Sequence, residues 1–296
     1  YRPIVRAYLH NSDLNGVDQT GDVALRIEGS KTLIKAFARY TELSGTDRLS
    51  GTFVSGSLIN LGVQGSYQIA PRTSLVGILS GAMSNYTTNS VVGSNIYTSE
   101  FGAYWAATER LSFGPALRYS ITESDNISTR DSWALMMQAQ YLVGERIRFM
   151  GSLGLEYAAN SEGNQQSTLG LTGKLSASYA INERWSWSND VDYVTVPSPT
   201  ETGYVINNLA VTTALTRQLL RATADVGLEY NLSNYESVNT VSTNLANENN
   251  LSVYLGYERK LFAERVTFLS RVSYTLNNGQ KDWSQLQISA GLAAAF

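Results

Sequence analysis

Three observations on the sequence predict an all-β chain that forms an antiparallel up-and-down transmembrane β-barrel of about 16 strands, with 14 strands as the alternative. Apolar residues recur at every second position over most of the chain, short turns of similar sequence recur about every 39 residues, and only 16% of the 296 residues are charged. A soluble globular chain carries about 25% charged residues. Residues 1–296 are expected to form one barrel domain.

The alternation identifies the strands, because a period of two is typical of a half-buried strand and not of a helix. It is clearest over residues 111–121, 147–157 and 220–230, where one face is apolar and the other is small and polar. Residues 1–43 alternate more weakly, which is the reason for the alternative count of 14. Pro115 lies inside one predicted strand, and since proline cannot donate to the ladder, a bulge or a water contact is expected there.

Seven tight turns separate the strands, and four of them share a Glu-Arg pair. They fall at 108–111, 144–147, 182–185, 263–266, 29–31, 70–72 and 216–218. Eight longer connections alternate with them, near 11–21, 44–51, 86–95, 124–130, 159–166, 197–203, 233–248 and 277–281. These fifteen connections join 16 strands and place both ends of the chain on the tight-turn side.

The apolar face is expected to point outward to lipid. A closed sheet of 16 strands encloses a space too wide for side chains to fill, so its apolar face cannot be an internal core. Alternating segments of about ten residues with short turns on one side and longer loops on the other are the signature of transmembrane barrels. No apolar run exceeds five residues, whereas a membrane-spanning helix needs about 20, which excludes a helical membrane protein.

Two aromatic belts support this orientation. Four tyrosines lie nine to eleven residues after the Arg of a Glu-Arg turn, at Tyr119, Tyr157, Tyr193 and Tyr274. Three further aromatic residues lie four residues before the Glu of such a turn, at Trp105, Tyr141 and Tyr179. The spacing matches the nine to eleven residues with which a tilted strand crosses a membrane. These seven residues are predicted to form girdles at the two membrane interfaces.

The last strand carries the most specific motif. Its apolar face ends on the carboxyl-terminal Phe296, and the polar, glycine and apolar positions before it are Ser289, Gly291 and Ala294. Here the chain resembles the outer-membrane β-barrel proteins of Gram-negative bacteria, although Ala294 is smaller than the residue usual in that family. The resemblance implies that these four residues are an assembly signal read by the barrel-assembly machinery. It further implies a multi-pass barrel in the outer membrane, in contact with lipid and lipopolysaccharide, with both termini periplasmic.

The composition argues against several other functions. The chain has no cysteine and one histidine, His10, so no metal centre, cofactor or imidazole-based catalytic group is expected, and the protein is predicted not to be an enzyme. A net charge of −3 with scattered Lys and Arg excludes a nucleic-acid footprint. Asp190 and Asp192 share the inward face and could serve acid–base chemistry or cation binding, but their interpretation as lumen-lining carboxylates is favoured.

The inward-facing charges suggest a selective pore, because charges lining a channel select and orient solutes. The predicted lumen-lining set is Arg6, Arg26, Lys35, Arg39, Arg118, Arg148, Asp190, Asp192, Arg221, Asp225 and Glu229. Two arcs of opposite charge stand out, Arg6, Arg26, Lys35 and Arg39 on the first three strands and Asp190, Asp192, Asp225 and Glu229 on strands 11 to 13. They predict a field across the lumen, although further charges of both signs lie elsewhere. The favoured function is passive diffusion or transport of small hydrophilic solutes. The alternatives are an export channel for a polymer such as an exopolysaccharide, and an anchoring barrel for a surface partner. A homo-oligomer or a periplasmic partner is compatible with each.

Overall fold

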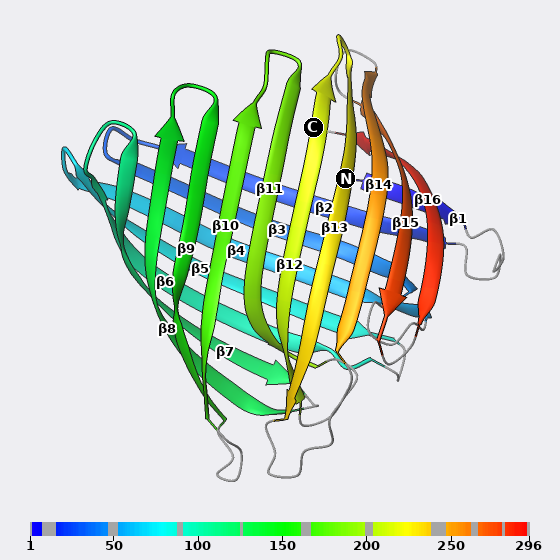
Figure 1. Cartoon of the computed structure of the whole chain (residues 1–296), viewed down its shortest axis with the longest axis horizontal. Helices are drawn as coiled ribbons and strands as arrows, with labels where there is room; N and C mark the ends of the chain where they lie inside the picture. The colour runs from blue at the N-terminus through cyan, green and yellow to red at the C-terminus, as the bar shows by residue number, and fades with distance from the viewer. Residues whose placement is uncertain are drawn as a thin grey trace.

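A computed structural model describes residues 2–7, 16–46, 53–87, 91–124, 127–160, 167–198, 204–237, 247–261, 266–279 and 282–294. Within these residues the chain forms 16 antiparallel strands, and each pairs with its neighbours in sequence. β1 also pairs with β16, so the sheet closes into a barrel (Figure 1). The predicted fold class and the count of 16 strands are confirmed.

The strands are β1 (Arg2–Ala7), β2 (Gly16–Glu28), β3 (Thr32–Thr46), β4 (Phe53–Ala70), β5 (Thr73–Tyr86), β6 (Ser94–Ala106), β7 (Leu111–Ser124), β8 (Ile127–Val143), β9 (Ile147–Asn160), β10 (Thr168–Ala180), β11 (Trp185–Pro197), β12 (Tyr204–Gln218), β13 (Ala222–Ser237), β14 (Glu248–Leu261), β15 (Val266–Asn278) and β16 (Trp283–Ala294). As far as the structure describes the chain, β1 is the shortest strand. Its register covers four positions with β16 and five with β2, whereas β12 and β13 pair over 15 positions.

Five of the seven predicted tight turns, at 29–31, 70–72, 108–111, 144–147 and 182–185, form where the sequence predicts them. In two of them a polar side chain bonds the backbone that follows it. The Thr108 hydroxyl accepts hydrogen bonds from the backbone N–H groups of Arg110 and Leu111, at 3.2 and 3.0 Å. The Asn182 side-chain oxygen does the same three residues before β11, at 2.9 and 3.0 Å. Short polar side chains that bond the following backbone favour turns in this way. Gly144, with φ of 62°, supplies the left-handed residue of the β8–β9 turn.

One turn lies later in the chain than predicted. β12 continues to Gln218, and the turn to β13 is closed by the Leu219 N–H donating to the Ala222 carbonyl at 2.7 Å. The predicted turn at 216–218 is therefore part of a strand, and Leu220 and Arg221 are in the turn. About half of the residues of the eight longer connections, and most of the turn at 263–266, lie outside the described residues. β2 begins at Gly16 and β8 at Ile127, so the connections near 11–21 and 124–130 are shorter than predicted.

Pro115 lies on β7 without the predicted bulge. Its register with β6 is the same on both sides of the proline, and only the pairs of Ala103 with Pro115 and Tyr104 with Gly114 are missing from the ladder. The neighbouring glycine explains how the strands stay in register, because a Cβ at Gly114 would lie 1.7 Å from the Ala103 carbonyl oxygen. The two backbones therefore approach closely, and the proline leaves a gap in the hydrogen bonding without a shift.

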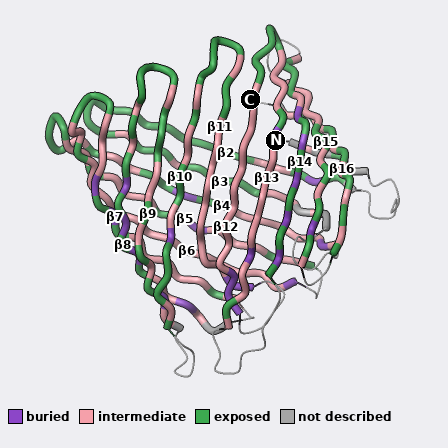
Figure 2. Tube along the Cα trace, in the orientation of Figure 1, coloured by how far each residue is buried: buried purple, intermediate pink, exposed green. Residues whose placement is uncertain are grey.

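The barrel is hollow. Its accessible area is 17427 Å², whereas a compact globular protein of this mass exposes about 12,000 Å². Among the described residues, buried positions occur as short isolated stretches and not as a continuous core (Figure 2). In the part of the chain that the structure describes, the one buried apolar cluster consists of Ala116, Ala134 and Met136 on β7 and β8. Both faces of the sheet are accessible, which is the property expected of a wall around a lumen.

Candidate functional site

The pairing registers divide the side chains into an outer and an inner face. On β9, Leu153 is 65% exposed, and Leu155 and Tyr157 share its face and are also exposed. The alternate positions carry Ser152, Glu156 and other small or polar residues. The same alternation continues around the ring through cross-strand pairs. The apolar face is outside and the polar face lines the lumen.

Charged side chains line the lumen at several heights, and one set of them shares a level. Nine of them lie five to seven residues from the tight-turn end of their strands: Asp22, Arg39, Glu100, Arg118, Lys174, Asp190, Asp192, Glu229 and Arg271. Since these strands are 13 to 16 residues long, the nine residues form a belt near the middle of the wall. We call this set the mid-lumen belt. Any solute that crosses the lumen passes it.

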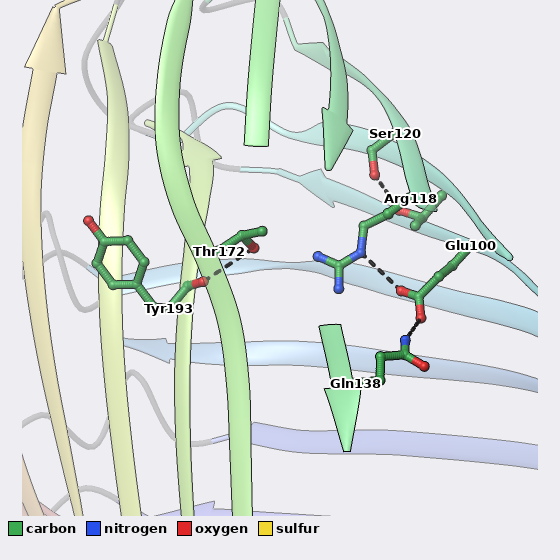
Figure 3. A network of polar contacts seen from close by, with 7 residues as sticks. Glu100, Arg118, Ser120, Gln138, Thr172 and Tyr193 are labelled. Atoms are coloured by element: carbon green, nitrogen blue, oxygen red, sulfur yellow. Dashed lines mark hydrogen bonds and ion pairs between the residues drawn. The ribbon is translucent and has the colours of Figure 1, made fainter. Parts of the chain in front are cut away.

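One polar network of the belt lies on β6, β7 and β8 (Figure 3). The Arg118 Nε donates to Glu100 Oε2 at 3.1 Å, and the Gln138 amide donates to the other oxygen of Glu100. The Ser120 and Thr98 hydroxyls are next on the same face of β7 and β6, and they form a hydrogen bond of 3.1 Å with each other. The side chains of Arg118 and Glu100 are 24% and 13% exposed. The two charges therefore largely neutralise each other, and little of either side chain is exposed to the lumen.

A second network lies on β13, β14 and β15. The Arg271 Nη2 donates to Glu229 Oε1 at 2.6 Å, and its guanidinium carbon lies 3.7 Å from the centroid of the Tyr254 ring. Asp225, on the same face of β13, has its carboxylate against Gly256. Arg271 is thus held by one acid and one aromatic ring, and it sits among further acids at this part of the wall.

The ring of Tyr254 in this second network packs directly against Gly227, which leaves no room for a larger residue at that position. A Cβ at Gly227 would lie 2.4 Å from the Tyr254 ring, so Gly227→Val must displace that ring and the Arg271 above it. We expect a loss of about 1–3 kcal/mol in the free energy of unfolding, measured by urea titration of the refolded barrel. Gly170→Val is the matched control, because nothing lies within 4 Å of a Cβ there. Equal losses in both variants would contradict this packing.

The acids of β11 have a different environment. Asp190 accepts a hydrogen bond from the Ser176 hydroxyl at 2.5 Å, and Asp192 is directly opposite Lys174 in the register with β10. Both acids face the lumen, as the favoured interpretation requires. Among the described residues, no group of three or more His, Cys, Asp and Glu side chains is arranged to hold a metal ion.

The structure places the remaining predicted lumen residues as follows. Arg26 and Lys35 are opposite each other on β2 and β3, and Arg26 forms an exposed ion pair with Glu28 at 2.8 Å. Arg148 faces the lumen near the tight-turn end of β9. Arg6 is on β1 opposite Ser289, but its side chain is outside the described residues, as is all of His10. Arg221 does not line the lumen: it is exposed in the β12–β13 turn, because β12 extends further than predicted.

The predicted arcs of opposite charge face each other across the ring, since β2 and β3 lie about half a turn from β11 and β13. Residues of the opposite charge, which the prediction did not include, also lie within or beside each arc. Asp22 and Glu28 lie among the basic residues, and Lys174 and Arg271 adjoin the acidic ones. The arcs are consequently neutralised in part by their neighbours.

The predicted girdle residues share the outer face and form two levels. Trp105, Tyr141 and Tyr179 lie one or two residues from the tight-turn ends of β6, β8 and β10. Tyr119, Tyr157, Tyr193 and Tyr274 lie eight to ten residues from those ends on β7, β9, β11 and β15. Tyr119 stacks on Trp133 with ring centroids 4.4 Å apart, and its hydroxyl donates to Asp131 at 2.7 Å. A polar partner at this level suits an interface between lipid and water.

Three residues of the predicted assembly signal lie in the second half of β16. Ser289 donates to the Arg271 carbonyl at 3.3 Å, Gly291 is opposite Leu269, and Ala294 is opposite Val266. Phe296 lies outside the described residues.

Sequence reasoning missed an apolar part of the lumen. Inward-facing positions of β3 to β6 include Phe37, Leu58, Val76, Ile78 and Ile96, as their registers with lumen-facing neighbours show. Residues 58–63 and 75–79 carry apolar side chains on both faces, and this loss of alternation is the signal that could have revealed them. One quarter of the lumen wall is therefore less polar than the rest.

No protein-family model and no curated protein sequence matches the chain. Among solved structures, it is similar to CdiB from Acinetobacter baumannii, with a TM-score of 0.60 at 7% identity over the whole chain. It is also similar to the FrpB iron transporter from Neisseria meningitidis, with a TM-score of 0.53 at 10% identity over 95% of the chain. The copper transporter OprC gives 0.51 at 10% identity, also over 95%.

These matches concern the fold, since the identities are very low. The chain spans 57 to 59% of the length of these three proteins. Among the described residues, no helix is long and apolar enough to cross a membrane. The fold is that of the β-barrels of the Gram-negative outer membrane.

Proposed function

We propose that the protein is an outer-membrane pore through which small hydrophilic solutes diffuse along a water-filled lumen. The observation that carries this proposal is the mid-lumen belt, where charged side chains of both signs project inward at one height from strands all around the ring. A buried charge without solvent would be costly, so a belt of this kind favours a wet lumen. In this proposal the tight-turn end and both termini are periplasmic, and the outer face contacts lipid and lipopolysaccharide.

The outer face supports the membrane part of the proposal. Two grooves of about 610 and 590 Å³ on that face are bounded almost entirely by apolar side chains, such as Leu61 and Leu79 in one and Leu153 and Leu175 in the other. Acyl chains of lipids suit surfaces of this kind. We further propose that Ser289, Gly291, Ala294 and Phe296 are recognised by the assembly machinery.

Conductance in planar bilayers tests the proposal against its alternatives. A steady ohmic current through the purified barrel is expected. A barrel that conducts only after a partner is added would indicate an export channel, and folded barrels without any current would indicate an anchoring role. Either of these outcomes contradicts passive diffusion.

The charge arcs predict ion selectivity within the same experiment. Asp190→Asn combined with Asp192→Asn removes two lumenal acids that lack an ion pair among the described residues, so the reversal potential in a salt gradient should shift toward anion preference. Asp131→Asn is the control, because Asp131 lies on the outer face, hydrogen bonded to Tyr119. An unchanged reversal potential in the double variant would contradict the predicted electric field across the lumen.

A further inference from the structure

A pocket of about 470 Å³ opens in the lumen wall over β2 to β6, in the apolar quarter. Its lining combines the ring of Phe37 and the side chain of Ile96 with the polar groups of Asp22, Arg39, Asn60 and Thr98. The volume lies within the range of about 300–1,000 Å³ typical of small-molecule sites. The pocket is at the height of the mid-lumen belt, so a diffusing solute meets it.

Phe37 presents an unusual surface for a hydrophilic pore. Its side chain faces the lumen between Lys35 and Arg39, and the residue is 48% exposed. A Cβ at the opposite residue, Gly62, would lie 2.7 Å from the Phe37 ring. Because Gly62 has no side chain, the ring lies against β4 and leaves an aromatic face accessible. Burying that face against a flat apolar group of a ligand would be favourable.

Two opposite charges lie beside this ring and form no ion pair with each other. Asp22 and Arg39 are directly opposite in the β2–β3 register, and both are exposed. Among the described residues, neither side chain has an ion-pair or hydrogen-bond partner, unlike Glu100 with Arg118 and Glu229 with Arg271 at the same height. A carboxylate can therefore bind Arg39 and an ammonium group can bind Asp22 at the same time.

We infer that this pocket is a low-affinity binding site for small zwitterions that carry an aromatic ring, such as aromatic amino acids. The ring of the solute would stack on Phe37, its carboxylate would bind Arg39 and its ammonium group would bind Asp22. The inference rests on the proposed function, for which it names a class of solute. Weak binding suits a channel, because a solute must leave the site as readily as it enters.

The test uses L-phenylalanine as the probe, in two independent measurements. Saturation-transfer NMR on the barrel in lipid nanodiscs reports binding whether or not the pore conducts. Current through single barrels in a planar bilayer reports block by the bound probe. Glycine, which lacks the ring, 3-phenylpropanoate, which lacks the ammonium group, and phenylalaninamide, which lacks the carboxylate, are the comparison probes. Phenylalanine should bind more tightly than all three.

The variants assign the binding to this pocket. Phe37→Leu should weaken phenylalanine binding about fivefold, as expected for the loss of one aromatic stacking contact, and leave glycine binding unchanged. Arg39→Gln should abolish the preference for phenylalanine over phenylalaninamide, and Asp22→Asn the preference over 3-phenylpropanoate. Tyr104→Leu is the matched control, because Tyr104 is also an inward-facing aromatic residue on β6 but does not line the pocket.

Two outcomes overturn the inference. The first is phenylalanine binding no tighter than glycine, and the second is phenylalanine binding that survives Phe37→Leu while it is lost in Tyr104→Leu. A barrel that binds phenylalanine in nanodiscs but carries no current would contradict the proposed pore and support the binding site. A barrel that conducts but does not bind phenylalanine would contradict the binding site and support the proposed pore.

Discussion

Leu153→Arg should destabilise the membrane-inserted barrel by about 2–4 kcal/mol, because it places a cation on the lipid face near the bilayer midplane. Leu153 is 65% exposed on the outer face and lies six residues from the tight-turn end of β9, between the two aromatic levels. Urea titration of barrels folded into lipid vesicles measures the free energy of unfolding directly.

The adjacent residue provides the control for this prediction. Ser152 is on the lumen face of the same strand, opposite Gln138 and Lys174. Ser152→Arg adds the same side chain one position away, where water can solvate it, so its cost should be much smaller. If Ser152→Arg were as destabilising as Leu153→Arg, the assignment of the outer and inner faces would be wrong.

Arg271→Gln should make the lumen more cation-selective. Arg271 is the cation that pairs with Glu229 and lies beside Asp225 and Glu258, so its loss leaves this part of the wall acidic. Two unit charges about 4 Å apart in water interact by about 1 kcal/mol, which corresponds to about a fivefold change in the cation-to-anion permeability ratio. Reversal potentials in a potassium chloride gradient measure that ratio.

Arg148→Gln distinguishes a local effect from a general loss of positive charge. Arg148 also faces the lumen, but it lies near the tight-turn end of β9, away from the mid-lumen belt. Its substitution should shift the reversal potential less than Arg271→Gln does. Equal shifts would mean that only the total charge matters and that the position of each charge in the lumen does not.

The fold can be predicted from the sequence because its strands and turns are determined by residues that are close together in the chain. Alternation and turn chemistry are properties of neighbouring residues, so the strands and tight turns can be read without tertiary information. The error at Arg221 has the same origin. Alternation places Leu220 and Arg221 in a strand, and only the hydrogen bond between Leu219 and Ala222 shows that they form the turn.

The site could be predicted only in part, because alternation assigns a face but not a lateral partner. Arg118 and Asp190 lie on the lumen face, but whether a charge is paired depends on the residue opposite it and on the conformations of both side chains. The register places Glu100 opposite Arg118 and Asp22 opposite Arg39, and among the described residues only the first of these two pairs forms an ion pair. Phe37 was missed for a different reason, since alternation equates an aromatic side chain with the lipid face.

The pairing of β1 with β16 has a consequence for the order in which the ring closes. Neighbouring strands elsewhere are joined by short turns or loops, so their ladders form between segments that are close in sequence. β1 and β16 are separated by nearly the whole chain, so their association carries a larger loss of chain entropy than the pairing of strands that are neighbours in sequence. We therefore expect the curved sheet from β2 to β16 to form first, with closure at β1 as the last step of folding and the first to reverse.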